Sequence, residues 1–165
     1  MYCVVVSDSH GRNEVFKQLR EMYPTASAYL HCGDSECPST ELDGFVSIQG
    51  NNDLYYDYPK QIILDLDGVR VLLIHGHQYP MYSVVEKLIV KAREEDCKLV
   101  LYGHTHIYKV TRFEDLVLVN PGSIHYNRDA SEPSYAIVTI ENGKIEVERK
   151  TLPREHKPRK REFLK

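Results

Sequence analysis

The chain lacks the features that mark membrane, secreted and nucleic-acid-binding proteins. No apolar run approaches the roughly 20 residues that a membrane-spanning helix requires. The N-terminus "MYCVVVSDSH" is apolar only over residues 3–6, without a basic start or a small-residue cleavage site, so we expect a cytoplasmic protein without a signal peptide. The 21 Lys and Arg residues are fewer than the 24 Asp and Glu residues, and the net charge of -3 argues against a dedicated nucleic-acid binder.

The cysteine pattern also lacks the signature of a structural zinc site. The chain has 4 cysteines but no C-x-x-C pair. Cys3 and Cys32 lie within apolar runs of strand length, where a thiol behaves as a small hydrophobic side chain. For a cytoplasmic chain we therefore expect free thiols rather than disulfides or a structural zinc ion.

The length and composition are those of one ordinary domain. The chain has 165 residues, of which 42% are hydrophobic and 27% charged. We expect the domain to span residues 1–153. Residues 154–165, "REHKPRKREFLK", are charged and contain proline, so we interpret them as a loose tail. The basic run 157–161 is then a solvated part of this tail and not a nucleic-acid site.

Apolar runs with the length and composition of β-strands recur along the chain. They are rich in Val, Ile and Tyr and are bounded by Gly, Asp, Asn or Pro. The expected strands cover residues 2–6, 28–31, 45–48, 61–66, 69–74, 98–102, 107–112, 116–120, 135–140 and 144–149. Two pairs of runs are separated only by Asp67-Gly68 and Asn142-Gly143, dipeptides that suit type I′ turns, so we expect two β-hairpins.

Two segments have helical periodicity instead. Residues 13–23 and 83–97 each place apolar side chains on one face, namely Val15, Phe16, Leu19 and Met22 in the first and Val84, Val85, Leu88, Ile89 and Ala92 in the second. Ser83 followed by Glu86 predicts a capping box at the start of the second helix. Strand–helix alternation in the first half predicts parallel strands, and the hairpins of the second half predict antiparallel ones, so the fold class is α/β with mixed sheets.

Five of the predicted strands each run into a turn at a Gly or Ser and have side chains of metal-binding type just past their carboxyl ends. These side chains are Asp8, His10, Asp34, Asn51, Asn52, Asp53, His75, His77, His104 and His106. Two neighbouring histidines taken alone are usually solvated loop residues. Ligand-type side chains in register at several strand ends are not explained in that way. Because sites in open α/β sheets form at the carboxyl ends of the strands, we expect these side chains to meet.

The residue types point to metal chemistry. Imidazole together with carboxylate suits Mn, Fe, Ni or Zn in mixed nitrogen and oxygen coordination, whereas closed structural zinc prefers cysteine. The candidate ligands are too many for one tetrahedral ion, so we divide them between two ions with one shared carboxylate. Two dications about 3.5–4 Å apart repel each other strongly unless an anion lies between them.

The motifs "DSH", "GD", "GNND", "HGH" and "GHTH", in this order, resemble the motif set of the calcineurin-like metallophosphoesterases. The short length and compact spacing are similar to the small prokaryotic, YfcE-type phosphodiesterase branch. The motifs cover residues 7–106, and the resemblance implies a four-layer α/β/β/α sandwich of two mixed β-sheets.

The resemblance also implies a ligand set. Asp8, His10 and His106 would hold the first ion, Asn51, His75 and His104 the second, and Asp34 would bridge the two. We expect two divalent ions, with manganese as the expected metal and iron, nickel, zinc or magnesium as the alternatives.

The charge of such a centre favours one class of substrate. Two dications, two carboxylates and a bridging hydroxide leave about one positive charge, which suits a monoanionic phosphodiester. Metal coordination lowers the pKa of water from 15.7 to about 7, so a hydroxide that attacks phosphorus in line exists near neutral pH. The sequence therefore predicts a dinuclear-metal-dependent phosphodiesterase that acts on a small phosphodiester.

Three further residues are candidate catalytic groups. Many relatives carry a His that protonates the leaving group where this chain has Asn52, which cannot give up a proton. His77 lies just beyond His75 and is either a substrate or leaving-group contact or a loop histidine. Asp53 either orients a ligating histidine or is a turn acid. His31 is expected to be buried and hydrogen-bonded, and residues 120–128 are either a wall of the pocket or a simple loop.

Other functions remain compatible with the sequence. A phosphomonoesterase, or a hydrolase of a nucleotide or sugar phosphate, would use the same centre. A protein-interaction scaffold on the same fold is an alternative of another class, and it predicts lost ligands, whereas every candidate position here carries a metal-binding group. A homo-oligomer is also compatible with the sequence, and no membrane partner is expected.

Overall fold

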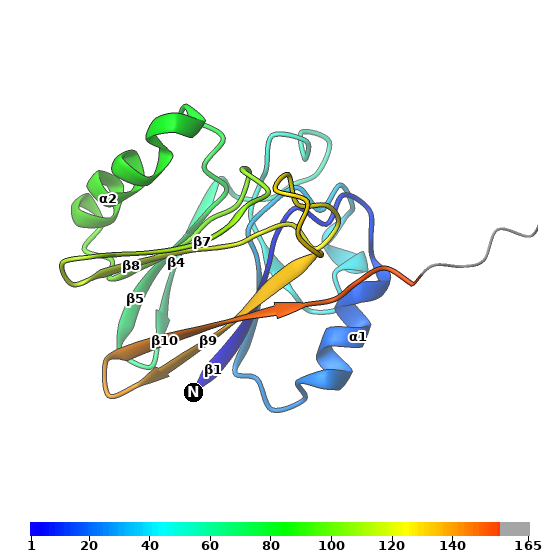
Figure 1. Cartoon of the computed structure of the whole chain (residues 1–165), viewed down its shortest axis with the longest axis horizontal. Helices are drawn as coiled ribbons and strands as arrows, with labels where there is room; N and C mark the ends of the chain where they lie inside the picture. The colour runs from blue at the N-terminus through cyan, green and yellow to red at the C-terminus, as the bar shows by residue number, and fades with distance from the viewer. Residues whose placement is uncertain (156–165) are drawn as a thin grey trace, which may run out of the picture.

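The computed structural model describes residues 1–155, and residues 156–165 lie outside the described part of the chain. The expectation of a loose tail over 154–165 therefore falls, apart from Arg154 and Glu155, outside the described residues. Two five-stranded sheets pack against each other, with helix α1 (Glu14–Met22) on the outer side of one and helix α2 (Val84–Glu94) on the outer side of the other (Figure 1). This is the predicted α/β/β/α sandwich.

The first sheet contains both ends of the described domain. Its strand order is β10-β9-β1-β2-β3, formed by β1 (Tyr2–Val6), β2 (Ala28–His31), β3 (Val46–Ser47), β9 (Ser134–Glu141) and β10 (Lys144–Thr151). Strands β1, β2 and β3 are parallel, while β9 runs antiparallel to both β1 and β10. The parallel half therefore directs the loops after β1, β2 and β3 to one edge.

The second sheet is mixed as well. Its order is β4-β5-β6-β8-β7, formed by β4 (Gln61–Leu66), β5 (Val69–Ile74), β6 (Leu99–Leu101), β7 (Tyr108–Phe113) and β8 (Leu116–Pro121). Strands β5, β6 and β8 are parallel, and the hairpin strands β4 and β7 close the two sides. The predicted hairpin pairs β4–β5 and β9–β10 are antiparallel, as expected. Strands β6 and β8 are parallel because β7 folds back outside β8 and leaves β8 beside β6.

Alternation along the strands divides the interior into layers. In β1, Cys3 and Val5 face the second sheet, whereas Val4 and Val6 face α1. Because both faces of β1 are covered, four consecutive apolar residues are all buried, as expected for a central parallel strand. The layer between the sheets contains Leu30, Ile48, Val71, Leu73, Leu99, Leu101, Val117, Val119, Ala136 and Val138 among others.

The helices follow the predicted periodicity with two departures. Met22 is 48% exposed, because it lies in the last turn of α1, beyond the part that packs on the sheet. The predicted capping box was wrong: the short 3-10 helix η2 (Met81–Ser83) leads directly into α2, and Ser83 makes no side-chain capping bond. A second 3-10 helix, η1 (Ser39–Glu41), lies between β2 and β3.

Both predicted hairpin turns are confirmed. Asp67 and Gly68 have φ of 53° and 81°, and Asn142 and Gly143 have φ of 50° and 78°, which is the pair of positive values that a type I′ turn requires. The cysteines are free and buried, as predicted. Within residues 1–155, no helix has both the length and the apolar character needed to cross a membrane.

Candidate metal centre

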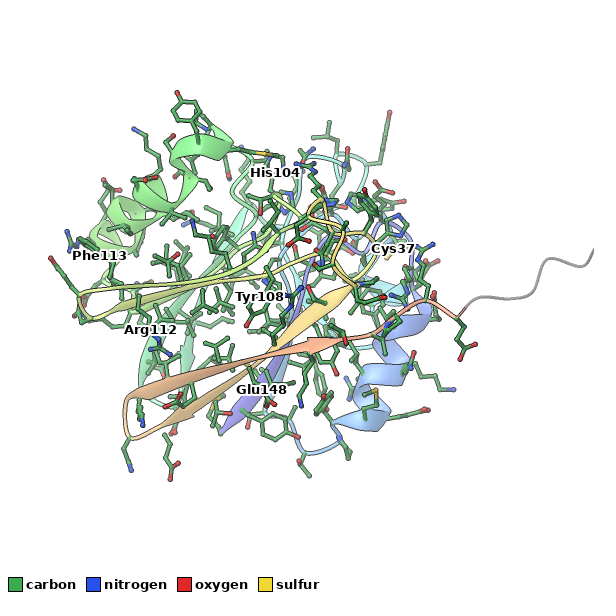
Figure 2. The ribbon with its side chains drawn as sticks, viewed as in Figure 1. Cys37, His104, Tyr108, Arg112, Phe113 and Glu148 are labelled. Atoms are coloured by element: carbon green, nitrogen blue, oxygen red, sulfur yellow. The ribbon has the colours of Figure 1, made fainter. Side chains whose placement is uncertain are left out.

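The predicted ligands gather where the parallel strands of both sheets end. Asp8 follows β1, Asp34 follows β2, His75 follows β5, and His104 follows β6. Figure 2 shows His104 among the side chains that collect at this end of the two sheets. The loops are held together by backbone hydrogen bonds, such as Asp8 N to Gly33 O at 3.0 Å and Gly103 N to His75 O at 3.1 Å.

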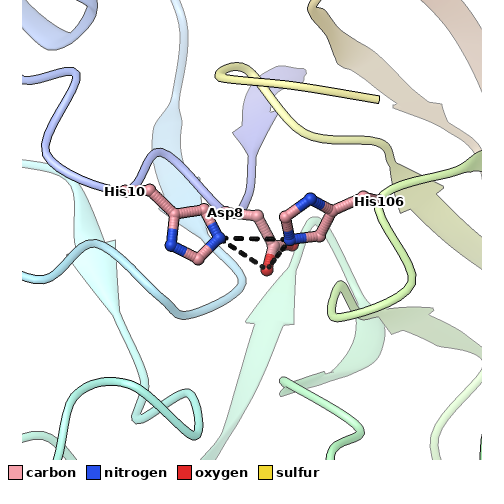
Figure 3. Close-up of side chains that lie close together, drawn as sticks. All are labelled: Asp8, His10 and His106. Carbon is pink, nitrogen blue, oxygen red and sulfur yellow. Dashed lines mark hydrogen bonds and ion pairs between the residues drawn. The ribbon is translucent and has the colours of Figure 1, made fainter. Parts of the chain in front are cut away.

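The first group of ligand atoms comes from Asp8, His10 and His106 (Figure 3). The Nε2 atoms of His10 and His106 lie 3.1 Å apart. Asp8 Oδ1 is 3.2 Å from His106 Nε2 and 3.8 Å from His10 Nε2. Asp8 is fully buried, whereas the two histidines are half-buried, so the group opens toward solvent on the imidazole side.

The other ring nitrogens of these histidines are already bound. His10 Nδ1 lies 3.0 Å from Glu36 Oε1, and His106 Nδ1 lies 3.0 Å from the carbonyl oxygen of Tyr126. A carbonyl and an ionised carboxylate can only accept, so each Nδ1 donates, and in a neutral ring Nε2 then carries a lone pair. Two lone pairs at 3.1 Å repel each other unless a cation lies between them, and the geometry therefore fits a metal ion.

A second group comprises Asp8, Asp34 and His75. His75 Nε2 lies 3.3 Å from Asp34 Oδ2, 3.8 Å from Asp8 Oδ1 and 3.1 Å from Asn51 Oδ1. His75 Nδ1 donates to the carbonyl oxygen of Cys32 at 2.7 Å, which again directs Nε2 into the site. All three members of the group are buried.

His104 lies beside the second group without joining it. Its ring centroid is 5.2 Å from that of His75, and its backbone N–H donates to Asp8 Oδ2 at 3.0 Å. The structure thus brings Asp8, His10, Asp34, His75 and His106 within ligand distance in two groups, with Asn51 and His104 adjacent. Asp8, rather than the expected bridge Asp34, belongs to both groups.

The electrostatics of the buried groups also fit a cation. Among the described residues, Asp8 Oδ1 is buried without any hydrogen-bond partner, although three Nε2 atoms lie around it. Burial alone would lower the pKa of His75, but Asp8 and the hydrogen bond to Asp34 raise the pKa to about 9. Burial would raise the pKa of Asp8, yet the nearby His75 and His106 hold it below the usual range. The oxygen and nitrogen donors, without thiolate, suit a divalent ion such as Mn, Fe, Ni or Zn.

The backbone at the candidate ligands is unusual. Asp8, His10, Asp34, His104 and His106 have φ between 42° and 71°, in the left-handed region that non-glycine residues seldom adopt. Such conformations cost of order 1–3 kcal/mol each and persist only where the surroundings impose them. Five of the candidate ligands share this conformation, although it also occurs in turns elsewhere in the described chain.

Two glycines permit the close approach of these loops. A Cβ on Gly50 would lie 2.0 Å from Asp34 Oδ1, and one on Gly103 would lie 2.0 Å from Ser7 Oγ and 2.6 Å from Asp8 Oδ2. Any side chain at either position would displace a carboxylate of the site.

Asp53 lies in a turn beside the site and binds backbone groups of the surrounding loops. Its carboxylate accepts the backbone N–H groups of Asp34 and Gly50, each at 2.8 Å, and of Glu36 at 2.9 Å. It makes no hydrogen bond to a histidine among the described residues, so the prediction of a histidine-orienting group was wrong. Asp53 N donates to Gly50 O at 3.2 Å and closes a turn, which agrees with the alternative of a turn acid, here fully buried. Asp53 ties the loop after β2 to the loop after β3.

Asn52 and His77 both lie beside the second group. Asn52 donates to both oxygens of Asp34, from its backbone N at 2.9 Å and its side-chain Nδ2 at 3.2 Å. The ring centroid of His77 is 5.4 Å from that of His75, and His77 Nδ1 is buried without a partner among the described residues. His77 therefore retains hydrogen-bonding capacity next to the site.

Residues 120–128 wrap around the first group, which favours the pocket-wall prediction. Ser123 Oγ donates to the carbonyl oxygen of Asp8 at 2.8 Å, and the ring centroid of His125 is 5.9 Å from that of His10. The prediction for His31 is confirmed: it is buried, with Nε2 2.8 Å from Ser9 Oγ and Nδ1 accepting from Gly33 N at 3.0 Å.

Sequence reasoning missed the groups that orient the histidines. Glu36 stands just after Asp34 in the run "GDSE", and its nearness to a predicted ligand was a usable signal. The carbonyl groups of Tyr126 and Cys32 carry no side-chain signature, so no pattern could identify them.

Two mixed sheets lie between helices, with carboxylates and imidazoles gathered at one edge in groups that could hold metal ions. Residues 1–143 match the calcineurin-like phosphoesterase superfamily domain, and the chain belongs to this family. It is 29% identical over 145 residues to the probable metallophosphoesterase YsnB of Bacillus subtilis, with 86% of each chain covered. A crystal structure of a predicted phosphoesterase from Streptococcus pneumoniae is 32% identical, with a TM-score of 0.84 over 91% of this chain and 88% of that one.

Two more distant structures share the fold. Vps29 of Entamoeba histolytica, solved as a zinc complex, is 20% identical, with a TM-score of 0.71 over 90% of this chain and 98% of that one. An archaeal phosphodiesterase is 21% identical, with a TM-score of 0.69 over 90% of this chain and 99% of that one. At these identities the likeness concerns the fold alone.

Proposed function

We propose that this metallophosphoesterase is a dinuclear-metal-dependent phosphodiesterase. The observation that carries the proposal is the pair of ligand groups that meet at Asp8, with the Nε2 atoms of His10, His75 and His106 all directed at its unpartnered oxygen. One such group would serve one ion, and two groups in contact would serve a pair. The catalytic domain in this proposal spans residues 1–153.

The ligands in this proposal are those that the motifs predict. Asp8, His10 and His106 would hold the first ion, Asn51, His75 and His104 would hold the second, and Asp34 would be the shared carboxylate. Asp8 Oδ2 already accepts from Ser7 Oγ at 2.5 Å and from His104 N at 3.0 Å, so Asp8 has only Oδ1 left for a metal. Both oxygens of Asp34 likewise accept from Asn52, so hydrogen bonding does not distinguish the two carboxylates. The assignment of Asp34 as the bridge rests on the motifs, and Asp8 lies within reach of both groups.

Two divalent ions would supply a nucleophile from water near neutral pH and stabilise charge on the phosphoryl oxygens. The chain holds the ligands in place for this chemistry. Asn52 fixes both oxygens of Asp34, Asp53 locks the backbone of the same loop, and Glu36 orients His10. His77, with a free Nδ1 next to His75, is the candidate contact for a phosphoryl or leaving-group oxygen.

The charge of the site supports a diester as substrate. Two dications, two carboxylates and a hydroxide leave about one positive charge, which matches a monoanionic phosphodiester better than a dianionic monoester. The solved archaeal relative is described as a phosphodiesterase. A scaffold function has less support, because no candidate ligand position has lost its metal-binding group.

Metal content and substrate preference test the proposal together. After reconstitution with Mn, elemental analysis should give two ions per chain, and bis(p-nitrophenyl) phosphate should be hydrolysed faster than p-nitrophenyl phosphate. A stoichiometry that stays at one or below would remove the dinuclear centre. A faster reaction with the monoester would favour a phosphomonoesterase, and bound metal without hydrolysis of either ester would favour a scaffold.

The leaving group gives a finer test. A departing alkoxide needs a proton, and general-acid help is worth roughly 10²–10⁴-fold. Because Asn52 cannot donate one, kcat/KM should fall steeply as the leaving-group pKa rises, and Asn52→His should make this dependence shallower. A shallow wild-type dependence that becomes steep only in His77→Ala would instead assign the acid to His77.

A further inference from the structure

A small pocket lies on the outer side of the second sheet, near the metal centre. Its volume is about 300 Å³, and it is lined by the start of α2, by η2 and by the segment that joins β6 to β7. Val84 and Tyr102 form its buried floor, while Tyr82 and Ile107 at its rim are 88% and 41% exposed. Ligand pockets are mostly apolar and start at about 300 Å³, so this one has room for a single small group.

The pocket shares a wall with the loop after β6. Thr105 lines the pocket and stands between the candidate ligands His104 and His106. Thr105 Oγ1 is held by Asn120 Nδ2 at 2.9 Å, so the wall is fixed rather than free to turn.

The loop after β5 forms part of the same wall. Gly76 stands between His75 and His77, and a Cβ added to it would lie 3.3 Å from Val84 Cγ2 and 3.9 Å from Tyr102 Cδ2. Gly76 therefore packs directly on the floor of the pocket. Gly76 and Thr105 are the middle residues of the two His-x-His runs. In each run, this one residue lies between the pocket and the candidate ligands.

Arg128 connects the two sites across the surface. Its backbone N–H donates to the carbonyl oxygen of His106 at 3.0 Å, and its guanidinium contacts Met81 Sδ at 3.5 Å at the rim of the pocket. An exposed cation thus lies between the metal centre and the apolar pocket. In a ligand with an anionic phosphate and an apolar ring, the phosphate would contact the metal centre and Arg128, and the ring would contact the apolar pocket.

We propose that the pocket binds the nucleobase of a nucleoside phosphodiester whose phosphate lies at the metal centre. Because Thr105 and Gly76 lie between the pocket and the candidate ligands, a spacer such as a sugar is needed between the phosphate and the ring. The exposed ring of Tyr82 offers a stacking face for any base, and Lys109 and Glu86 at the edge of the pocket offer polar groups to the base edge. This inference rests on the proposed function and gives it a substrate class.

Matched substrates test the pocket in the Mn-loaded protein. Thymidine 5′-(p-nitrophenyl phosphate) and methyl p-nitrophenyl phosphate share the leaving group and the single charge and differ only in the retained alcohol. The nucleoside diester should have the higher kcat/KM. Tyr82→Ala should lower that value roughly fivefold to a hundredfold, mainly through KM, because stacking on the ring is lost, and should leave the methyl diester unchanged. Val90→Ala, at a residue of α2 that is 54% exposed and outside the pocket, should change neither value.

A binding measurement keeps this test separate from catalysis. Calorimetry should show that thymidine 5′-phosphate binds more tightly than methyl phosphate and that Tyr82→Ala removes the difference. This result would support the pocket even if neither diester were hydrolysed, an outcome that would overturn only the proposed function. Equal wild-type constants for the nucleoside and methyl compounds would overturn the pocket. A preference for the nucleoside compounds that persists in both Tyr82→Ala and Ile107→Ser would also overturn the pocket. The apolar rim would then be available to a protein partner.

Discussion

Two of the regions with left-handed backbone, the Asp-Gly and Asn-Gly hairpin turns and the metal edge, differ in what imposes that conformation. In the hairpin turns it falls on Asp67-Gly68 and Asn142-Gly143, where a Cβ added to either glycine would meet nothing within 4 Å. At the metal edge it falls on aspartate and histidine, while the neighbouring Gly103 has no space for a side chain.

The difference separates local from tertiary causes. A hairpin turn adopts positive φ because its own dipeptide prefers that conformation, and it needs no help from the rest of the chain. At the metal edge the conformation is imposed by distant partners, such as Ser123 on the carbonyl of Asp8 and Tyr126 on His106. Changes at the two regions should therefore differ in what they damage.

Alanine at a glycine should give the largest contrast. In Gly103→Ala the new Cβ would overlap Ser7 Oγ and crowd Asp8, so we expect hydrolysis to be abolished and stability to fall by about 1–3 kcal/mol or more. Gly68→Ala should cost about 1–2 kcal/mol for the left-handed conformation and leave kcat/KM unchanged. Thermal unfolding and diester hydrolysis of both variants measure the contrast. Wild-type activity in Gly103→Ala would show that the loop after β6 does not need its close approach to Asp8.

Neutralising one carboxylate of the metal centre should have the next largest effect. Asp34→Asn should lower kcat by more than Asp8→Asn, because a bridging carboxylate serves both ions. Both losses should exceed the roughly 10–100-fold that follows from removing a group that only orients a ligand. Metal content and kcat of the two variants decide the order. A larger loss of both metals in Asp8→Asn would instead make Asp8, which lies in both groups, the shared ligand.

A third change removes only the charge that orients His10. Glu36→Gln keeps an acceptor for His10 Nδ1 but loses the carboxylate, so the metal affinity should fall about 10–100-fold while the fold is retained. Titration of the metal-free protein with Mn, followed by calorimetry, measures this effect. Glu21→Gln, in an exposed pair with Lys17 on α1, is the matched control and should bind Mn as the wild type does. Equal affinities for all three proteins would exclude a role for Glu36.

The sequence was sufficient to predict most strands because their patterns are local. The Asp-Gly and Asn-Gly turns and the fully apolar β1 carry their own signals, whereas the turn at Glu114 and Asp115 between β7 and β8 has no glycine and was not recognised as a hairpin. The failed capping box has a similar cause, because the preceding 3-10 turn, which the pattern does not reveal, determines the backbone of Ser83.

For the site, the motifs predicted which side chains would meet but not what holds them. The carboxylate of Asp53 binds three backbone N–H groups, and backbone donors are invisible in a sequence pattern. The same is true of the carbonyl groups that fix His75 and His106. The sequence can predict residues whose own side chains bind the metal. The contacts that support these residues depend on tertiary structure.

The last contrast concerns the pH dependence of stability in the metal-free protein. The pKa of His75 is raised from 6.5 to about 9 by Asp8 and Asp34 against its burial, so its contribution is complete below about pH 6.5 and is lost as the pH rises to about 9. Burial lowers the pKa of His31 to about 4, so its contribution is lost as the pH falls from 6.5 to 4.

Together the two histidines predict a stability maximum near pH 6.5 when a chelator is present. Bound metal takes the place of the proton on His75, so the fall in Tm between pH 6.5 and 9 should disappear in the Mn-loaded protein. His75→Asn should remove the same alkaline fall from the metal-free protein and leave in place the acid fall, to which His31 contributes. The hairpin variant Gly68→Ala should lower Tm by a similar amount at every pH, because its strain involves no proton. An alkaline fall that persists in His75→Asn would mean that the positive charge at the metal edge resides on another residue.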